Sequence, residues 1–285
     1  MAVISLSGTG VWSGDLRYDP DAGARADAVA ELDALGYTAV WIPDIGGDVF
    51  EALDVLLGAT QRMTVASGIL NIWRHEPAET GRWWAGLDQE RKARTLIGLG
   101  VSHGPLIGET WRRPLTAMRE YLDGLDEAGV PVERRCLAAL GARMLDLARD
   151  RSAGAHPYLV TPEHTGSARK ALGADALLAV EQGVVLESDP GRAREIGRTA
   201  IQHYCALPNY ANNWLRLGYT QEDIDERSDR LVDGLVAWGD LDAIKARVDA
   251  HRAAGADHVC IQVLEEPDQG MPRAAWRELA AALAG

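Results

Sequence analysis

The sequence has few of the features that would assign it to a functional class directly. Its 285 residues contain only three cysteines, Cys136, Cys205 and Cys260, and no two of them form a CxxC pair. An odd number of scattered cysteines is typical of a reducing compartment and offers no zinc site. We therefore expect a cytoplasmic protein whose cysteines are small buried apolar residues.

Positive charge and long apolar runs are also scarce. The chain has 29 lysines and arginines against 42 aspartates and glutamates, which gives a formal net charge of −13. This balance argues against nucleic acid or an anionic membrane as a partner. No segment approaches ~18 uninterrupted apolar residues, so no membrane span is expected. The N-terminal MAVISLSGTGVW lacks the basic region of a secretory signal and is predicted to be a strand.

Several nucleotide and metal motifs are missing. The sequence contains no GxGxxG, no GxxxxGK[ST] and no HExxH, which argues against a Rossmann site, a P-loop and a metalloprotease. A hydrolase triad is not expected either. TPEHT at 161–165 is interpreted as a helix start with Thr161 as the cap. His75 and Glu76, in RHEPAE, are expected to be capping or surface groups. We predict no metal site.

One pattern recurs along the chain: a helical stretch, a glycine and a short apolar strand. ARADAVAELDALG runs into YTAVWIPD, and LDAIKARVDAHRAAG runs into ADHVCIQVL. Helices that alternate with nearly continuous apolar strands indicate parallel strands covered on both faces. The fold class predicted is therefore α/β.

Eight strand candidates favour a closed TIM-type (β/α)8 barrel over an open sheet. They lie at about 2–12, 38–44, 62–70, 95–102, 134–140, 154–160, 182–187 and 257–264. No linker divides the chain, so residues 1–285 are predicted to form a single domain. Residues 207–240 are too long for a simple connection. They are predicted to be a helical insertion before the last strand, over the C-terminal mouth of the barrel.

Polar residues follow most of the predicted strands, at the end of the barrel where such folds carry their sites. These positions are Trp12, Asp44, Gly68 to Asn71, Ser102 and His103, Gly141 to Arg143, His156 to Tyr158, Glu187 and Gln262. Their shared location is stronger evidence than the identity of any one of them.

The stretch VASGILNIW, residues 65–73, has a glycine near the end of a buried strand. Gly68 would let a flat ring approach the backbone, because it has no Cβ. A bulge there would turn Ile69 toward the barrel mouth and leave Asn71 free to hydrogen-bond a heterocycle. The structural alternative is that Gly68 relieves crowding and Asn71 begins a turn.

The stretch LAALGARMLDLARD places a glycine at a strand end, directly before a helix. The N–H groups from Gly141 through Ala142 to Met144 would suit one phosphate, and Arg143 could add a bidentate contact. Turns of this kind are common between strands and helices, so the phosphate is one of two interpretations.

Two histidines follow predicted strands. His103 is the acid–base candidate, because a histidine exchanges a proton near neutral pH. His156 precedes Pro157, which must break the strand ladder, because a closed barrel has no free edge. Either histidine could instead be a structural residue.

Nine tryptophans stand against a single phenylalanine. Trp83 and Trp84 are predicted to pack on a helix. Indoles at strand ends or in loops could wall a cavity for a ring system. The candidates are Trp12, Trp73, Trp111 and Trp214, of which Trp12, Trp73 and Trp214 are assigned to the substrate pocket.

Together, VWIPD, VASGILNIW, LIGLGVSHG, LAALGARMLDLARD, GAHPYLVTPEHT and AWGDLDAIKARVDAHRAAGADHV resemble the bacterial luciferase-like barrel superfamily. They are most similar to its coenzyme F420-dependent oxidoreductases of actinobacteria. The resemblance runs from Gly10 to about Leu264.

The resemblance implies roles for the strand-end residues. The third strand would end in a non-prolyl cis peptide, Gly68–Ile69, that backs the cofactor ring. Asp44, Asn71 and Ser102 would line the cofactor pocket. Gly141 to Met144 would hold a phosphate and His156–Pro157 would form a neighbouring wall. His103 falls where some relatives carry a glutamate near the reacting carbon.

The implied activity is hydride transfer between F420 and an unidentified small organic substrate. The alternatives are an FMN-dependent luciferase-like monooxygenase and a cofactor-free binding protein on the same fold. An aldolase-type barrel would need a lysine at a strand end, and no predicted strand ends in one. Arg112, Arg113 and Arg143 are candidate partners for the polyglutamyl tail of F420. Because relatives are commonly dimers, a homodimer is expected.

Overall fold

The structure is a computed structural model that describes residues 6–111, 113–266 and 269–283. Its strands are β1 (Gly8–Trp12), β2 (Ala39–Ile42), β3 (Thr64–Ser67), β4 (Leu70–Asn71), β5 (Thr95–Gly100), β6 (Arg135–Leu137), β7 (Gly154–Ala155), β8 (Leu177–Val185), β9 (Val236–Trp238) and β10 (His258–Val263).

The helices in the same residues are α1 (Asp15–Tyr18), α2 (Ala22–Ala34), α3 (Val49–Ala59), α4 (Pro77–Gly86), α5 (Gln89–Ala93), α6 (Gly104–Ile107), α7 (Pro114–Glu127), α8 (Ala142–Arg151), α9 (Pro162–Leu172), α10 (Pro190–Cys205), α11 (Pro208–Arg216), α12 (Gln221–Asp225), α13 (Asp229–Leu235), α14 (Leu241–Ala253) and α15 (Arg273–Leu283). Two short 3₁₀ turns, η1 (Gly108–Thr110) and η2 (Val132–Arg134), complete them.

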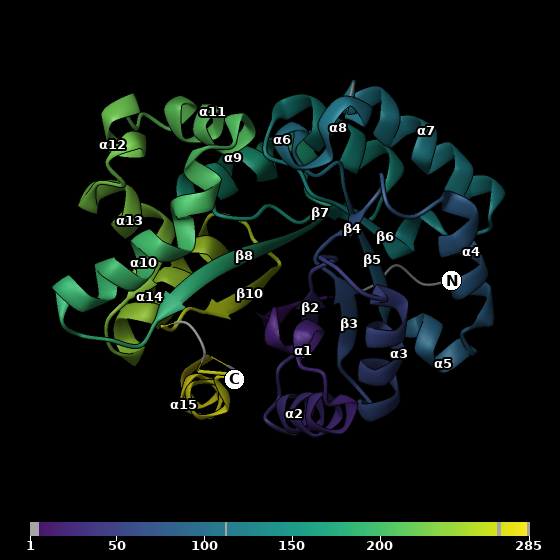
Figure 1. Cartoon of the computed structure of the whole chain (residues 1–285), viewed down its shortest axis with the longest axis horizontal. Coiled ribbons are helices and arrows are strands. Elements are labelled where there is room, and N and C mark those ends of the chain that lie inside the picture. The colour runs from purple at the N-terminus through teal and green to yellow at the C-terminus, as the bar shows by residue number, and fades with distance from the viewer. Residues whose placement is uncertain (1–5, 112, 267–268, 284–285) are drawn as a thin grey trace.

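The strands close into a parallel barrel. The pairing order is β10-β1-β2-β3-β5-β6-β7-β8, and β8 pairs back onto β10. Helices surround the barrel, and α10 to α13 gather beside α9 on one side of it (Figure 1). The predicted α/β fold class, a closed (β/α)8 barrel with a helical insertion before the last strand, is confirmed.

One predicted strand began too late in the sequence, and one strand was missed. The seventh barrel strand, β8, begins at Leu177 rather than at 182, because alanine and leucine in ALLAV suit a helix as well as a strand. Within the predicted insertion, β9 adds a short strand that pairs with residues 183–185 of β8. Neither position shows an alternating apolar pattern.

The strand predicted at 154–160 is shortened by its proline. Only Gly154 and Ala155 form β7, and the ladder stops before Pro157, as expected for a residue without an N–H. The next helix, α9, begins after Thr161, whose side chain accepts a hydrogen bond from the N–H of His164. Both predictions are confirmed.

Two layers of apolar side chains position the site. The larger layer lies between the barrel and its helices, and includes Val29, Leu32 and Trp276. The smaller one fills the barrel interior, where Trp41 packs among small residues that include Cys136 and Cys260. These two cysteines are buried as predicted, whereas Cys205 is only partly buried.

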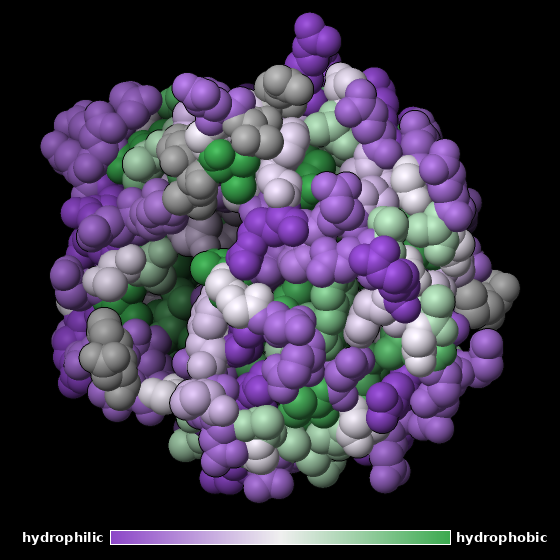
Figure 2. All heavy atoms as spheres, turned by 45° about the vertical axis from the view of Figure 1, so that its right-hand side comes forward, coloured by the Kyte–Doolittle hydropathy of each residue, from purple (hydrophilic) through white to green (hydrophobic). Residues whose placement is uncertain are grey.

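The outer surface is mostly polar, with hydrophobic atoms lying mainly in recesses on the face seen in Figure 2. Among the described residues, no helix has both the length and the apolar character needed to cross a bilayer.

Candidate functional site

A cavity of about 430 Å³ opens at the C-terminal ends of the strands. Its wall contains ten of the predicted site residues: Trp12, Asp44, Gly68, Ile69, Asn71, Ser102, His103, Gly141, Met144 and His156. The predicted residues Trp73, Ala142, Arg143, Pro157 and Trp214 do not line it. Residues from most of the strand ends thus meet at one place, as the barrel topology requires.

The bulge after the third strand forms one side of this cavity. The Gly68–Ile69 peptide bond is cis, as the resemblance implied. After it the chain resumes pairing as β4, opposite Leu99 and Gly100 of β5.

Two glycines of β5, which the sequence analysis did not single out, make room for this bulge. A Cβ at Gly98 would lie 2.0 Å from the carbonyl oxygen of Ser67. A Cβ at Gly100 would lie 2.4 Å from Cδ1 of Ile69. Both are shorter than any van der Waals contact, so the GxG of LIGLG is required by the neighbouring strand.

The absent side chain of Gly68 makes room for Trp12. A Cβ at this position would lie 2.7 Å from Nε1 of Trp12 and 3.3 Å from Cβ of Trp41. The same Trp12 nitrogen donates a hydrogen bond to the carbonyl oxygen of Gly68 across 3.1 Å. These contacts bear out the structural alternative that Gly68 relieves crowding, and the approach of a cofactor ring to Gly68 stays a prediction.

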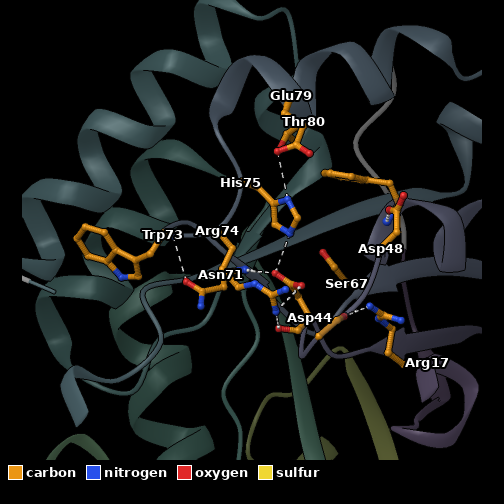
Figure 3. A network of polar contacts seen from close by, with 12 residues as sticks. Arg17, Asp44, Asp48, Ser67, Asn71, Trp73, Arg74, His75, Glu79 and Thr80 are labelled. Atoms are coloured by element: carbon orange, nitrogen blue, oxygen red, sulfur yellow. Dashed lines mark hydrogen bonds and ion pairs between the residues drawn. The ribbon is translucent and has the colours of Figure 1, made fainter. Parts of the chain in front are cut away.

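Asp44 is the centre of a buried polar network (Figure 3). Its Oδ2 accepts from the Asn71 N–H at 2.9 Å and lies 3.1 Å from Nε2 of His75. Its Oδ1 lies 3.5 Å from Nη1 of Arg74. Burial alone would raise the pKa of Asp44. The hydrogen bonds from His75 and Asn71 and the charge of Arg74 lower it below its ordinary value, so Asp44 is a carboxylate.

His75 is not the surface or capping group that was expected. It lies between Asp44 and Glu79, whose Oε2 is 3.3 Å from Nδ1 of His75 (Figure 3). The hydrogen bond to Asp44 raises the pKa of His75 above its usual range. The partner Asp44 lies at the end of a different strand, so RHEPAE alone contains no signal for this pair.

One polar atom in the cavity wall keeps free hydrogen-bonding capacity. The Asn71 Oδ1 accepts from the N–H of Trp73 at 3.1 Å, while no described residue accepts from its Nδ2. The Oδ1 of Asp44 is fully buried and is paired with Arg74. The Nδ2 of Asn71 is therefore the donor available to the edge of a bound ring.

His103 follows β5 and lines the same cavity. Its Nδ1 lies 3.1 Å from Oδ1 of Asn209 on α11. Because an amide oxygen only accepts, Nδ1 carries the proton and the lone pair is on Nε2. Burial lowers the pKa of His103 below its ordinary value, which keeps the ring neutral at neutral pH.

His156 is more deeply buried. Its Nδ1 donates to the carbonyl oxygen of Ala179 at 2.9 Å, and its ring stacks on Trp41 with centroids 4.1 Å apart. Burial lowers the pKa of His156 to about 4, so the ring is neutral. Its Nε2 has no partner among the described residues. Pro157 lies beside it, outside the cavity wall.

The turn predicted to hold a phosphate begins α8. Gly141 is the residue before the helix and, with Met144, lines the cavity. No side chain caps this helix, and the N–H groups of Ala142 and Arg143 have no acceptor among the described residues. The Ala142 and Arg143 side chains are exposed outside the wall. Arg113 is exposed too, and Arg112 lies outside the described residues.

Only some of the predicted tryptophans reach the cavity. Trp12 and Trp111 line it. Trp73 packs against the core with its indole N–H on the carbonyl oxygen of Val101, at 2.7 Å. Trp214 is fully buried, and its indole donates to the carbonyl oxygen of Leu159 at 3.2 Å. Trp214 therefore anchors the insertion and does not face a substrate, because it lies on the apolar face of α11.

Three tyrosines supply one wall of the cavity. Tyr158 follows β7, Tyr204 ends α10 and Tyr210 begins α11, and all three line the cavity. Tyr158 was among the strand-end positions of the sequence analysis, whereas Tyr204 and Tyr210 were missed. Those two belong to helices near and within the insertion, whose position over the barrel is set by tertiary packing, and no local pattern marks them.

Residues 100–104 read GVSHG and so do match the GxSxG spacing, contrary to the expectation that no hydrolase motif is present. Ser102 has a positive φ of 51° between β5 and α6. Among the described residues, however, no histidine is hydrogen-bonded to the Ser102 hydroxyl, so the base that a serine nucleophile needs is not in place. Nor is any group of three or more acidic, histidine or cysteine side chains in these residues arranged to hold a metal.

The fold and the cavity together define a (β/α)8 barrel with a cavity at the strand ends. Within that class, residues 1–129 match the family described as luciferase-like monooxygenase. A Mycobacterium tuberculosis protein named as a coenzyme F420-dependent oxidoreductase is 29% identical over 105 residues, which cover 35% of this chain and 30% of the relative.

Solved structures extend the similarity to the whole fold. An F420-dependent secondary alcohol dehydrogenase superposes with a TM-score of 0.74 at 12% identity, covering 97% of this chain and 98% of the other. The F420-dependent tetrahydromethanopterin reductase of Methanopyrus kandleri gives 0.70 at 14% identity and the same coverage. An FMN-bound Baeyer–Villiger monooxygenase of Pseudomonas putida gives 0.66 at 13% identity, covering 98% of both chains.

The family match agrees with the resemblance over the first 129 residues. The solved structures show that nearly the whole chain has the same barrel fold.

Proposed function

We propose that this protein uses coenzyme F420 to exchange a hydride with a small organic substrate. The observation that carries the proposal is the cavity wall beside the Gly68–Ile69 bond, where Asn71 offers a free Nδ2 next to the Asp44 carboxylate. The names of the Mycobacterium tuberculosis relative and of two structural neighbours support the choice of F420.

The residues present fit such a cofactor. The free Nδ2 of Asn71 suits an acceptor at the edge of a deazaflavin ring. The unpaired N–H groups at the start of α8 suit its phosphate. When bound, the cofactor supplies the hydride exchange itself.

The remaining chemistry falls to the protein. His103, held neutral by burial and oriented by Asn209, presents Nε2 as the group that takes or returns a proton. Tyr204 and Tyr210 cover the cavity from the side of the insertion and exclude water from it.

FMN is the second candidate, and one observation favours it. No arginine or lysine among the described residues lines the cavity, so a polyglutamyl tail would find its cations only outside the wall, at Arg113 or Arg143. FMN ends at its phosphate and needs no cations beyond it. An FMN-bound neighbour shares the fold.

The test is a titration of the purified protein with F420 and FMN side by side, followed by tryptophan quenching, since Trp12 and Trp111 line the cavity. We expect F420 to bind more tightly. Asn71→Ala should weaken binding about 3- to 10-fold, the effect of one hydrogen bond. The exposed Asn212→Ala on α11 is the matched control. Tighter FMN binding would select the monooxygenase, and no binding of either would favour a cofactor-free protein.

We also propose a homodimer, which light scattering on the purified chain would test directly.

A further inference from the structure

The cavity has two unlike sides. Small residues, Gly68, Gly100, Ala138 and Gly141, lie on the side of β3, β5 and β6. The other side carries Tyr158, Tyr204 and Tyr210, here called the tyrosine wall, with Trp12 beside it. A flat cofactor ring fits the side of small residues, so the tyrosine wall is left for the substrate.

The rings of the tyrosine wall form one continuous surface. Their centroids are 5.4 Å apart between Tyr158 and Tyr204 and 5.0 Å between Tyr204 and Tyr210, with Trp12 5.5 Å from Tyr158. Aromatic rings at these separations are in contact. A surface of this kind favours a hydrocarbon ring over an extended polar chain.

The hydroxyl groups of the tyrosine wall differ in whether their proton is already used in a hydrogen bond. Tyr158 donates to Oε1 of Gln262 at 2.7 Å, and Tyr204 donates to the Tyr158 oxygen at 3.4 Å. A phenol has one proton, so both donors are already engaged. The Tyr210 hydroxyl has no hydrogen-bond partner among the described residues and remains a free donor.

A free acceptor belongs to the neighbouring ring. His103 uses Nδ1 to donate to Asn209, which leaves the lone pair of Nε2. The rings of His103 and Tyr210 are neighbours, with centroids 5.5 Å apart. The cavity wall therefore carries one free donor and one free acceptor on two adjacent residues.

The same region offers no buried cation to a charged substrate. Lysine and arginine are absent from the wall in the described part of the chain. Its histidines are His103 and His156, whose pKa values are lowered by burial so that both are neutral, and His203 on α10, which is exposed to solvent. An anion beside Tyr210 and His103 would lose its hydration without a buried ion pair, which is unfavourable.

We propose that the substrate is an uncharged ring compound with one alcohol or ketone oxygen, its ring on the tyrosine wall and its oxygen between the Tyr210 hydroxyl and Nε2 of His103. A hydroxyl group satisfies both partners, because it accepts from Tyr210 and donates to His103. A ketone oxygen satisfies only Tyr210. The assignment of this side to the substrate rests on the proposed function, which places the cofactor on the other side.

Four small probes of similar size test the inference: 1-phenylethanol, acetophenone, ethylbenzene and benzoate. Their affinities are measured by calorimetry on the protein with and without its bound cofactor. We expect 1-phenylethanol to bind most tightly, acetophenone next, ethylbenzene about 3- to 10-fold more weakly than acetophenone, and benzoate not measurably.

Tyr210→Phe isolates the proposed contact. It should weaken the binding of 1-phenylethanol and acetophenone about 3- to 10-fold and leave the affinity for ethylbenzene unchanged. Tyr204→Phe is the matched control from the same wall, because the Tyr204 hydroxyl already donates to Tyr158. It should change the affinities for the three neutral probes by one common factor.

Benzoate binding as tightly as acetophenone would overturn the inference, as would a Tyr210→Phe effect equal for all neutral probes. If the cofactor binds but these discriminations are absent, only this inference fails. If the probes behave as expected but neither cofactor binds, the proposed function fails and the pocket assignment stands.

Discussion

The carboxyl group of Glu181 accepts a hydrogen bond from the backbone N–H of Leu159 across 3.0 Å. Leu159 has a positive φ of 52° and lies just beyond Pro157, where the β7 ladder has stopped. The carbonyl oxygen of Leu159 accepts from Trp214. Glu181 on β8 thus binds the N–H of Leu159, and Trp214 on α11 binds its carbonyl oxygen. Together these two contacts connect the barrel to its insertion.

The first prediction concerns pH and stability. Burial raises the pKa of Glu181 to about 8, well above its ordinary 4.5. The folded protein therefore keeps a proton that the unfolded chain releases above about pH 4.5, so stability falls as the pH rises from there to about 8 and is then level. Glu181→Gln removes this dependence while retaining an oxygen for the Leu159 N–H.

Thermal unfolding between pH 5 and 9 checks this expectation. The stability of Glu181→Gln relative to the native chain should increase up to about pH 8, by roughly 2–5 kcal/mol in total. Glu222→Gln, exposed on α12, should show no such increase. A constant difference between Glu181→Gln and the native protein across this range would show that Glu181 is ionised in the folded state.

The second prediction concerns the other side of the same turn. Trp214→Phe leaves the buried carbonyl oxygen of Leu159 without its donor and opens a small void, which should cost about 2–4 kcal/mol. Because the Asn209 hydrogen bond raises the pKa of His103, a displaced α11 should also lower that pKa further.

Denaturant unfolding and an NMR titration of His103 measure the two effects. Trp83→Phe on α4, which loses an exposed indole contact to Asp54, is the control and should change neither appreciably. An unaltered His103 pKa in Trp214→Phe would mean that α11 is held in place by other contacts.

The third prediction separates two explanations for Gly68. Gly68→Ala should displace Trp12, cost about 1–3 kcal/mol and weaken cofactor binding. If Trp12 is the obstacle, the double variant Gly68→Ala/Trp12→Ala should bind the cofactor as Trp12→Ala does. A cofactor titration of the four proteins tests this.

Gly86→Ala on α4, where no heavy atom lies within 4 Å of an added Cβ, is the control glycine. An undiminished effect of Gly68→Ala in the Trp12→Ala background would instead place the cofactor ring against residue 68.

The fourth prediction concerns His103. His103→Ala should leave cofactor affinity unchanged and reduce kcat roughly 100-fold or more, the usual contribution of a positioned proton-transfer group. In the native protein kcat/KM should stay constant as the pH falls to 6.5. It should decline only when the pH approaches the pKa of His103, because burial lowers that pKa below its ordinary value.

Asn209→Ala removes the hydrogen bond that raises this pKa, so it should move the decline to still lower pH. Turnover that survives His103→Ala would remove His103 from the mechanism, whereas a profile unmoved by Asn209→Ala would remove only the positioning contact.

Features governed by neighbours in the sequence were predictable. Thr161 caps a helix through an atom three residues away, and Pro157 stops a ladder because it lacks an N–H. In both cases the physical cause lies within a few residues of the chain. The Gly68–Ile69 cis bond was instead implied by the family resemblance.

Features that depend on distant partners were not predictable. His75 was assigned to the surface because Asp44 reaches it from another strand. Trp214 was assigned to the pocket because the face that α11 buries depends on where the insertion packs. Tyr210 was missed for the same reason.

The recess at Gly100 is filled by the side chain of Ile69, which projects from the bulge between β3 and β4. Enlarging residue 100 therefore requires a shift or a smaller side chain at residue 69, so a single-site library at position 100 would return mostly inactive clones. Directed evolution aimed at exchanging one coenzyme for another should randomise the two codons jointly.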